Sequence, residues 1–328
     1  MFRKEILNKE KNSVEDIKIS NNGSLLIIGN KYTLSSMDII KIKKKFDNIE
    51  YLEEKYISDE KIINFLKDNI HSKDIRLVVF NSSKKLSTNI INFFIELQNS
   101  VSFSTFDSFE ENILNKIYIP EDKSSINYLQ EIQPYSRFAY VSKRVVDYVG
   151  ALTLLTLASP VMLYSVYKIK KESKGSILFK QPRVGQDGKD FNCLKFRSMH
   201  ENSKFDPYTR KNDSRIFPWG KFMRKSRIDE LPQLFNVLKG DMHLIGPRAE
   251  WNILVKEYKN EIAFYSQRHI VKPGITGWAQ VNYPYGVNAK DAREKLMFDL
   301  YYIKNWNMWL EFKTILKTAS VIIGKKGV

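Results

Sequence analysis

Two adjacent carboxylates, Asp229 and Glu230, lie in an arginine-rich segment, "MRKSRIDELPQLFNVLKGDMHLIGPRAE". Arg224 and Arg227 precede the pair, and Arg248 follows it. Arginine binds phosphate through a planar fork that is always charged, so an ionised carboxylate beside such residues has phosphorus as a target. The second carboxylate can hold a divalent cation, which neutralises phosphate charge. These residue types at this spacing predict phosphoryl-transfer chemistry.

A short helix must position this pair. The apolar residues after it recur at helical spacing, at Leu231, Leu234, Phe235 and Leu238, and Gly240 stands where a helix ends. We therefore expect a helix that begins near Asp229 and Glu230. Asp is a common N-cap and Pro232 is tolerated in a first turn, so this helix alone leaves a structural role for the pair open.

A basic hairpin is expected in "SILFKQPRVGQDGKDFNCLKFRSM", with two strands joined through Gly185 and Asp187-Gly188. The hairpin carries five basic residues, Lys180, Arg183, Lys189, Lys195 and Arg197. Basic residues beside a turn usually form a solvated face, so the segment is weak evidence by itself. We predict that Arg183, Lys195 and Arg197 bind substrate phosphate.

An uncharged run extends from Tyr148 to Tyr167, with Ser159-Pro160 near its middle. Its length would just span a hydrocarbon core of ~30 Å, but proline disfavours a straight helix. Basic residues flank both sides, at Lys143, Arg144, Lys168, Lys170 and Lys171, and such flanks prefer the cytoplasmic side. We predict a re-entrant helix over about 139–171, broken at Ser159 and Pro160. A simple spanning helix is the alternative.

The charge distribution separates the two halves of the chain. Of the net charge of +16, residues 1–135 contribute −1 and the remainder contributes +17. The basic half should be attracted to a phospholipid surface, a phosphorylated substrate or nucleic acid. Cys193 is the only cysteine, which excludes a disulfide framework, and the four scattered histidines make no tight metal cluster.

The N-terminal part alternates between strand and helix patterns. "GSLLIIGN" and "DIRLVVFNSS" read as buried strands, and "SMDIIKIKKKFDN", "DEKIINFLKDNI" and "STNIINFFIELQNS" have helical spacing. We predict a Rossmann-like α/β domain over 1–135, with a linker around 120–137 and a regulatory or structural role, because no glycine-rich phosphate loop follows the first strand. The first residues lack a secretory signal, so we expect the N-terminus to stay in the cytoplasm.

The second half, residues 136–328, is expected to be an α+β membrane-associated domain. Its last segments, "DAREKLMFDLYYIKNW" and "MWLEFKTILKTASVIIGKK", are typical of amphipathic helices, with aromatic residues close to lysines. Such helices suit a membrane interface, and packing on the domain core is an equal alternative.

Several ordered motifs resemble one family. "SRIDELPQLFNVLKGDMHLIGPR", "KPGITGWAQVN" and the hairpin segment, following a Pro-broken apolar helix, are similar to the bacterial sugar transferases, the monotopic polyprenyl-phosphate phosphoglycosyl transferases. The resemblance covers roughly Tyr140 to Val328. Larger members carry a comparable α/β domain after membrane helices that we do not find in this chain.

The resemblance implies transfer of a sugar phosphate from a UDP-sugar to undecaprenyl phosphate, the first membrane step of exopolysaccharide, lipopolysaccharide or glycoconjugate synthesis. It implies that Asp229 is the nucleophile of a ping-pong reaction that releases UMP, with Mg²⁺ held by Glu230 and, less strongly indicated, by Glu311. Arg224 and Arg248 would hold phosphate. The chain would act at the cytoplasmic face of the bacterial inner membrane, on phospholipid, with a homodimer left open.

Two positions depart from the family pattern. His243 stands where Ser is frequent, and "QVNYPYG" replaces a Gly-Arg pair, as in the larger hexose-transferring branch. Galactose, glucose and N-acetylated sugars all remain candidates. Two other classes are weighed against the enzyme. A basic nucleic-acid-binding protein leaves the apolar run unexplained, so we expect no nucleic-acid partner, and a catalytically silent membrane scaffold would need no carboxylate pair.

Overall fold

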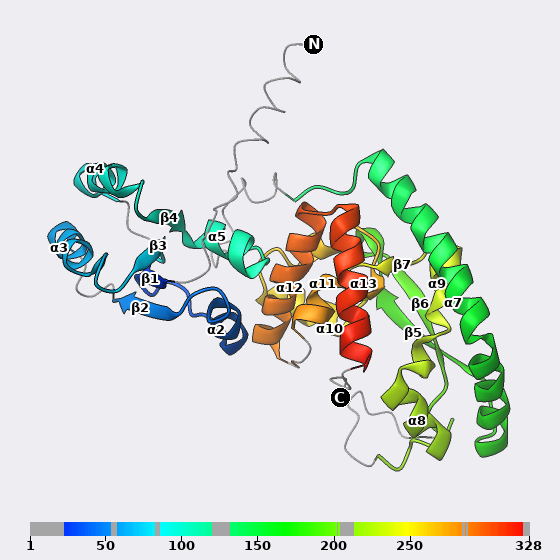
Figure 1. The fold of residues 1–328 in the computed structure, drawn as a ribbon. Helices are drawn as coiled ribbons and strands as arrows, with labels where there is room; N and C mark the ends of the chain where they lie inside the picture. The colour runs from blue at the N-terminus through cyan, green and yellow to red at the C-terminus, as the bar shows by residue number, and fades with distance from the viewer. Residues whose placement is uncertain are drawn as a thin grey trace, which may run out of the picture. The chain divides into compact units, whose positions relative to one another are not determined.

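The computed structural model describes residues 23–53, 58–82, 86–119, 132–201, 203, 213–283, 286 and 288–323 (Figure 1). The chain divides into two compact units, Met1–Asn115 and Lys116–Val328. Most of the linker expected around 120–137 lies outside the described residues, so a domain boundary after residue 135 stays a prediction. The expectation of a cytoplasmic N-terminus also concerns residues outside this range.

The first unit is an α/β unit on a parallel sheet with the strand order β2-β1-β3-β4. Its strands are β1 (Ser24–Ile28), β2 (Asn48–Leu52), β3 (Ile75–Phe80) and β4 (Ser102–Thr105). Its helices are α2 (Ser36–Ile42), α3 (Asp59–Asn69), α4 (Thr88–Leu97), α5 (Phe106–Phe109) and the π-helical η2 (Glu110–Leu114). The two expected strands and three expected helices are confirmed.

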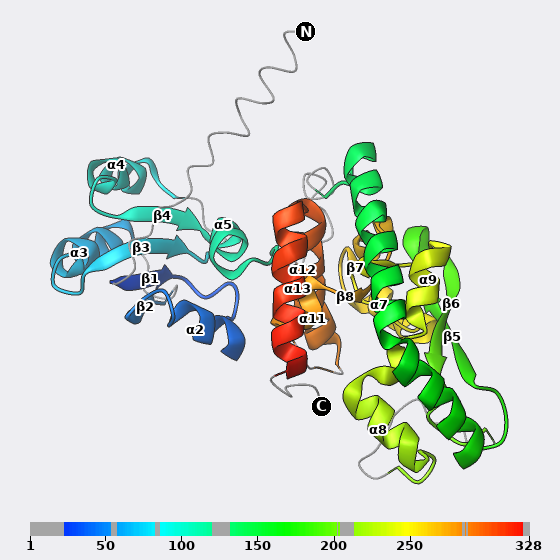
Figure 2. The ribbon, with the colours of Figure 1, turned by 45° about the vertical axis from the view of Figure 1, so that its right-hand side comes forward.

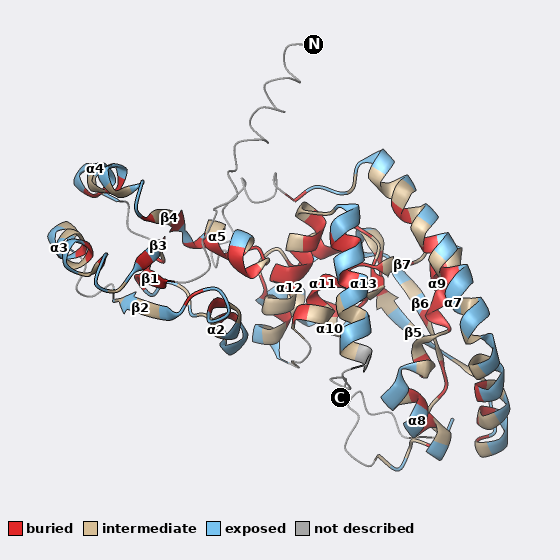
Figure 3. Ribbon diagram, in the orientation of Figure 1, coloured by how far each residue is buried: buried red, intermediate tan, exposed pale blue. Residues whose placement is uncertain are grey.

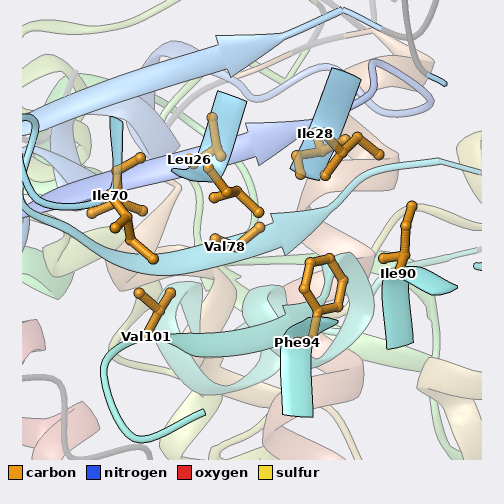
Figure 4. Packing of buried hydrophobic residues seen from close by; sticks show 10 residues of the cluster. Leu26, Ile28, Ile70, Val78, Ile90, Phe94 and Val101 are labelled. Atoms are coloured by element: carbon orange, nitrogen blue, oxygen red, sulfur yellow. The ribbon is translucent and has the colours of Figure 1, made fainter. Parts of the chain in front are cut away.

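The core of the first unit lies on both faces of this sheet. Leu26, Ile28 and Val78 pack on one face against Ile90 and Phe94 of α4 (Figure 4). The alternate residues of β1 and β3, which point to the other face, are also buried: Leu25, Ile27, Leu77 and Val79. Burial on both faces explains why each strand contains an uninterrupted apolar run, over residues 25–28 in β1 and 77–80 in β3.

The second unit begins with α7 (Arg137–Glu172), followed by the antiparallel strands β5 (Leu178–Val184) and β6 (Asp190–Phe196) around the turn η3 (Gln186–Gly188). Then come α8 (Pro218–Ser226), η4 (Ile228–Glu230), α9 (Gln233–Lys239), β7 (His243–Ile245), α10 (Asn252–Glu261), η5 (Tyr265–Ile270), β8 (Gly274–Thr276), α11 (Trp278–Asn282), α12 (Ala289–Lys304) and α13 (Met308–Ile323). The expected hairpin and the two expected C-terminal helices are confirmed.

Helix α7 is long and apolar enough to cross a membrane. It is continuous across Pro160, where the sequence predicted a break, and it changes direction along its length (Figure 2). Pro160 has no amide hydrogen for the carbonyl of Thr156, four residues earlier, but Ser159 Oγ donates to that oxygen at 2.8 Å. The hydroxyl thus replaces the lost hydrogen bond, which lets the helix bend without ending.

One stripe of α7 packs on the rest of the second unit, while the other faces of the helix are largely exposed (Figure 3). Ala151 packs near Leu234 and Val237, and Ile169 packs near Phe217 and Met223. Away from the stripe, large apolar side chains are exposed, with Leu157 74% and Leu163 71% accessible. Exposed apolar surface of this extent indicates contact with lipid or with another protein.

Candidate active site

The carboxylate pair lies in a sharp turn between α8 and α9. Arg227 ends α8 in the left-handed region, at φ 60°, and η4 then carries Asp229 and Glu230. Regular helix begins only at Gln233, after Pro232, so the expected start near Asp229 is four residues too early. Left-handed backbone at a non-glycine residue costs ~1–2 kcal/mol. Gly240 ends α9 at φ 95°, as its position predicted.

The turn places the Asp229 carboxylate inside the protein. Its residue is 8% exposed, and among the described residues Oδ1 has no hydrogen-bond partner. Burial raises the pKa of Asp229 above its ordinary value, and Glu230 adds to the rise, while Lys195, Arg224 and Arg227 oppose it. Because its negative charge is poorly solvated, this carboxylate is more nucleophilic than an exposed one.

Glu230 has the opposite electrostatic environment. Its Oε1 lies 2.9 Å from Lys195 Nζ, 3.6 Å from Arg248 Nη2 and 3.8 Å from Arg227 Nη1. Burial by itself would raise the pKa of Glu230, but Lys195 and Arg248 outweigh it and hold that pKa well below its usual range. The two neighbouring carboxylates therefore differ in their surroundings: Glu230 lies beside three cations, and one oxygen of Asp229 has no partner among the described residues.

Three of the predicted phosphate-binding residues come together in one cavity. Arg183, Lys195 and Arg248 line it, together with Gln233. Arg183 is held by hydrogen bonds to Gln181 Oε1, at 2.8 Å, and to the carbonyl of Ala249. Sequence reasoning missed Gln233, although a polar residue next to Leu234 at the first turn of an apolar helix was a signal for it.

Arg248 is positioned by the close approach of β7 and β8. Gly246 N donates to Thr276 O, and Gly274 N donates to Pro247 O, both at 2.9 Å. A Cβ at Gly274 would lie 2.1 Å from Gly246 N, so only glycine allows this approach. The "GPR" and "KPGITG" segments thus fix the backbone that leads to Arg248.

Arg224 and Arg197 have different surroundings. Arg224 lies close enough to Asp229 for its positive charge to lower the pKa of that carboxyl group. Arg197 is 5% exposed and donates to Ser173 O at 2.9 Å, to Met199 O at 3.2 Å and to the carbonyl of Ser176. Its guanidinium therefore ties the end of α7 to β6, and its predicted role in phosphate binding stays a prediction.

Glu311 lies in a separate buried cluster on α13. It accepts from Lys143 Nζ and Trp306 Nε1, both at 2.5 Å, and from the hydroxyl of Tyr302. Among the described residues, no three His, Cys, Asp or Glu side chains form a metal-binding group, so Glu311 does not join the pair. Asp229 and Glu230 alone still fit Mg²⁺, which proteins commonly hold through one or two carboxylates and substrate phosphates.

A buried pair that the sequence did not reveal lies on β7. His243 Nδ1 is 2.5 Å from Asp147 Oδ2 of α7, and Leu244 N donates to Asp147 Oδ1 at 2.8 Å. His243 was noted only as a departure from the family pattern. The two residues are 96 positions apart, so no local spacing could have paired them. The second departure, in "QVNYPYG", falls partly on residues outside the described ones.

The arrangement suits the binding and attack of a phosphorus centre. Lys195, Arg183 and Arg248 supply positive charge around Glu230, and Asp229 supplies a partly desolvated carboxylate beside them. Cations that hold phosphate oxygens reduce the repulsion that an approaching anion meets.

Comparison with known proteins agrees with this chemistry. Residues 138–325 match the family model described as bacterial sugar transferase. The chain is 46% identical over 199 residues to a UDP-N-acetylgalactosamine-undecaprenyl-phosphate N-acetylgalactosaminephosphotransferase of Aeromonas hydrophila, covering 60% of this chain and 47% of the relative.

Two further relatives act on hexoses. One, 40% identical over 202 residues, is an undecaprenyl-phosphate galactose phosphotransferase of Salmonella typhimurium strain LT2, covering 56% of this chain and 41% of the relative. The other, 40% identical over 190 residues, is a UDP-glucose:undecaprenyl-phosphate glucose-1-phosphate transferase of Escherichia coli K12, covering 57% and 41%. Each match spans less than half of the relative.

Proposed function

Because this chain belongs to the bacterial sugar transferase family, in the branch of the hexose-1-phosphate transferases, we propose that it transfers a sugar phosphate from a UDP-sugar to undecaprenyl phosphate and releases UMP. One observation carries the proposal: Asp229 has a buried oxygen without a partner among the described residues, beside a cluster of three cations around Glu230.

In the first step, an oxygen of Asp229 attacks the phosphorus that bears the sugar. The bond from that phosphorus to the UMP oxygen breaks, UMP leaves, and the sugar phosphate is bonded to Asp229 as an acyl phosphate. Lys195, Arg183 and Arg248 bind the phosphate oxygens and stabilise the charge that develops on them. The raised pKa of Asp229 supports this role, because a more basic carboxylate is a better nucleophile.

In the second step, a phosphate oxygen of undecaprenyl phosphate attacks the same phosphorus. The bond to Asp229 breaks, which regenerates the carboxylate and yields the undecaprenyl diphosphate sugar. Asp229 is the nucleophile of the first step and the leaving group of the second, so one difficult transfer becomes two easier ones. We propose that Asp229 and Glu230 hold Mg²⁺, which when bound neutralises phosphate charge.

Intact-protein mass spectrometry tests the covalent step. The full chain in detergent, given a UDP-sugar and Mg²⁺ but no lipid acceptor, should gain the mass of one sugar phosphate. Asp229→Asn should gain none, because an amide is a poor nucleophile. Addition of undecaprenyl phosphate should remove the adduct from the wild-type protein. A panel of UDP-galactose, UDP-glucose and their N-acetylated forms, assayed for UMP, then identifies the sugar.

Absence of both UMP release and adduct in folded, membrane-bound protein would instead favour a scaffold without catalysis. Single-turnover release of UMP that requires undecaprenyl phosphate and forms no adduct would contradict the ping-pong mechanism and indicate direct transfer between the two substrates.

We also propose that α7 enters the inner membrane from the cytoplasmic face and returns to it. Contacts at both ends of the helix support this arrangement. Near its start, Arg144 Nη1 donates to Val237 O at 3.1 Å, and at its end Glu172 accepts from Trp219 N at 2.6 Å. Both partners belong to the second unit, so a helix that crossed the bilayer would have to part from one of them. The middle of the helix carries exposed apolar side chains, with Leu157 74% and Leu163 71% accessible.

Cysteine labelling tests the topology. Gln133 and Lys174 flank α7 and are both exposed. The two variants, Gln133→Cys and Lys174→Cys, are made in a Cys193→Ser background. Both should react with an impermeant thiol reagent in inside-out vesicles, and neither should react in right-side-out vesicles. Reaction of the two sites from opposite faces would rule out re-entry. Ser159→Ala, which removes the bond to Thr156 O, should shift the labelling toward that crossing pattern.

A further inference from the structure

A cavity of about 280 Å³ lies in the second unit, beside the start of α7. Met242 lines the small cavity next to Arg248, whereas the following residue, His243, lines this larger one. The larger cavity is also lined by Tyr135, Arg137, Tyr140 and Lys272. Its volume is several times the ~30 Å³ share of a water molecule, so it is large enough for an organic group.

One ring nitrogen of His243 has no partner in the part of the chain that the structure describes. The residue is 1% exposed, and its Nδ1 is bonded to Asp147. An ionised carboxylate can only accept, so Nδ1 carries the proton and Nε2 carries a lone pair. Nε2 is buried and has no hydrogen-bond partner among the described residues. Because buried polar atoms are usually hydrogen-bonded, this nitrogen favours a ligand that donates a hydrogen bond to it.

The charged residues that line the cavity are both cations, Arg137 and Lys272. Lys272 Nζ donates to the hydroxyl of Tyr140 at 2.8 Å and lies 5.2 Å from the centre of that ring. An ammonium group has three N–H donors, so this bond uses only one of them. None of the described lining residues is a carboxylate, so the two cations favour an anionic ligand. Arg137 is exposed at this end of α7.

We infer that this cavity is a second binding site, which takes a phosphate ester that bears a hydroxyl group. Arg137 and Lys272 bind the phosphate, and His243 Nε2 accepts from the hydroxyl. The headgroup of phosphatidylglycerol and soluble glycerol phosphate share this chemistry. Phe138, the residue after Arg137 in α7, is 84% exposed and offers an apolar side chain to an acyl chain near this end of the helix. The site is separate from Asp229 and does not depend on the transfer reaction.

Two probes distinguish the sources. Glycerol 3-phosphate is titrated calorimetrically into the full chain in detergent, with methyl phosphate, which lacks the carbon-bound hydroxyl, as its matched control. In the lipid arm, native mass spectrometry counts phosphatidylglycerol against phosphatidylcholine retained from mixed nanodiscs. Binding of the soluble probe identifies a free phosphate ester as sufficient, and selective retention of phosphatidylglycerol alone identifies the lipid headgroup.

Two variants test the assigned contacts, and a third variant serves as their control. His243→Asn keeps an N–H donor for Asp147 but has no acceptor at the position of Nε2, because its amide is shorter than the ring. Lys272→Met removes a cation. Each should weaken binding of the responding probe about tenfold, the loss expected for one hydrogen bond or charge contact. Lys170→Met, at an exposed position near the other end of α7, makes the same charge change and should leave binding unaltered.

The proposal is overturned if neither probe binds, if methyl phosphate binds as tightly as glycerol phosphate, or if Lys170→Met weakens binding as much as Lys272→Met. If His243→Asn does not fold, as judged by thermal unfolding, Arg137→Gln and Lys272→Met at the cavity carry the same test against Lys170→Met.

Discussion

The two units differ in how they bury polar groups. In the first unit, two buried polar side chains bond to the backbone: Asp38 completes the capping box of α2, and Asn81 bonds to the backbone of Tyr32, 49 positions away. In the second unit, buried charges pair across long sequence distances, as in Lys143–Glu311 and Arg268–Asp299. The first kind of burial satisfies backbone hydrogen bonds, whereas the second brings two opposite charges together inside the protein.

This difference in the burial of charged side chains distinguishes the first unit from the unit that holds the candidate active site. Buried ionic groups contribute little net stability, so their concentration in one unit indicates chemistry or specificity there. The unit that holds them also holds Asp229, whose environment raises its pKa. Four variants, each with a matched change in the other unit or at its border, test this contrast.

The largest effect is expected for Asp229→Asn. UMP release should fall by about 10³-fold or more, since the nucleophile is lost. Stability at neutral pH should be unchanged or higher: burial raises the folded-state pKa, so above that pKa the ionised carboxylate disfavours folding, and removal of the charge relieves it. Both are measured on detergent-solubilised protein, by UMP assay and thermal unfolding.

The matched change in the first unit is Asp38→Asn. Asp38 Oδ2 accepts from Ser35 N at 3.0 Å and from Ser35 Oγ at 2.7 Å, so the variant should lose about 1 kcal/mol of stability and no activity. Full activity in Asp229→Asn would remove the basis of the contrast.

The second effect is on stability alone. Lys143 Nζ and Glu311 Oε1 are 2.5 Å apart, with side chains 1% and 5% exposed. Lys143→Met should destabilise the protein by about 3–5 kcal/mol, because it leaves a buried carboxylate without its cation. Chemical unfolding monitored by tryptophan fluorescence measures the loss, and Glu311→Gln added to Lys143→Met should recover part of it.

The corresponding pair in the first unit is Lys73–Glu50, at 2.9 Å with side chains 37% and 31% exposed. Lys73→Met should cost less than about 1 kcal/mol, since water screens the pair. Equal losses from the two lysine variants would show that burial does not distinguish the units.

The third effect is on acid stability. Burial lowers the pKa of His243 from 6.5 to about 4, with Asp147 opposing the shift. As pH falls below 6.5 the unfolded chain takes up this proton before the folded protein does, so stability is lost progressively down to about pH 4. The full contribution is on the order of 3 kcal/mol.

His243→Asn should therefore flatten the decline of melting temperature with acidification across this range. The matched change is His71→Asn in the first unit, where the side chain is exposed, and it should leave the decline as it is. An unaltered decline in His243→Asn would contradict the assigned protonation.

The smallest effect concerns the border between the units. Lys116 Nζ pairs with Glu294 at 3.0 Å, Ile117 N donates to Met297 O at 2.9 Å, and Arg293 donates to Ile119 O at 2.6 Å. A chain that starts at Lys116 should keep UMP release, and one that starts at Ser136 should also keep it but melt a few degrees lower. Complete loss of activity in the folded, membrane-bound longer chain would show that the first unit takes part in the reaction.

Much of the α/β framework was predictable because its signals are local. Strands β1 and β3 each contain an uninterrupted apolar run of four residues, as burial on both faces favours. Strands β2 and β4 were not predicted: "NIEYL" and "SFST" lie at the edges of the sheet, where partial exposure permits polar residues and removes the pattern. The start of α9 was misplaced because the pattern of Leu231 and Leu234 continues through the tighter turn that precedes it.

The sequence predicted which residues belong to the site, but it did not predict which of those residues contact one another. Side-chain chemistry singled out Asp229, Glu230 and the neighbouring arginines. It could not distinguish Arg248, which lies beside Glu230, from Arg197, whose donors bond to backbone carbonyls up to 24 residues away. Which acceptor a guanidinium meets depends on chain packing, and no spacing in the sequence encodes it.

By itself, the sequence determined the residue types that the chemistry requires, the apolar helix with its Ser159-Pro160 element, and the basic character of the second half. Tertiary structure alone decided that Asp229 is buried, with an oxygen that no described residue contacts by a hydrogen bond, while Glu230, one residue away, lies beside three cations. It also decided that Glu311 joins Lys143 and that His243 joins Asp147. The reason is that solvation and charge depend on which atoms lie within a few ångströms, and long-range packing brings those atoms together.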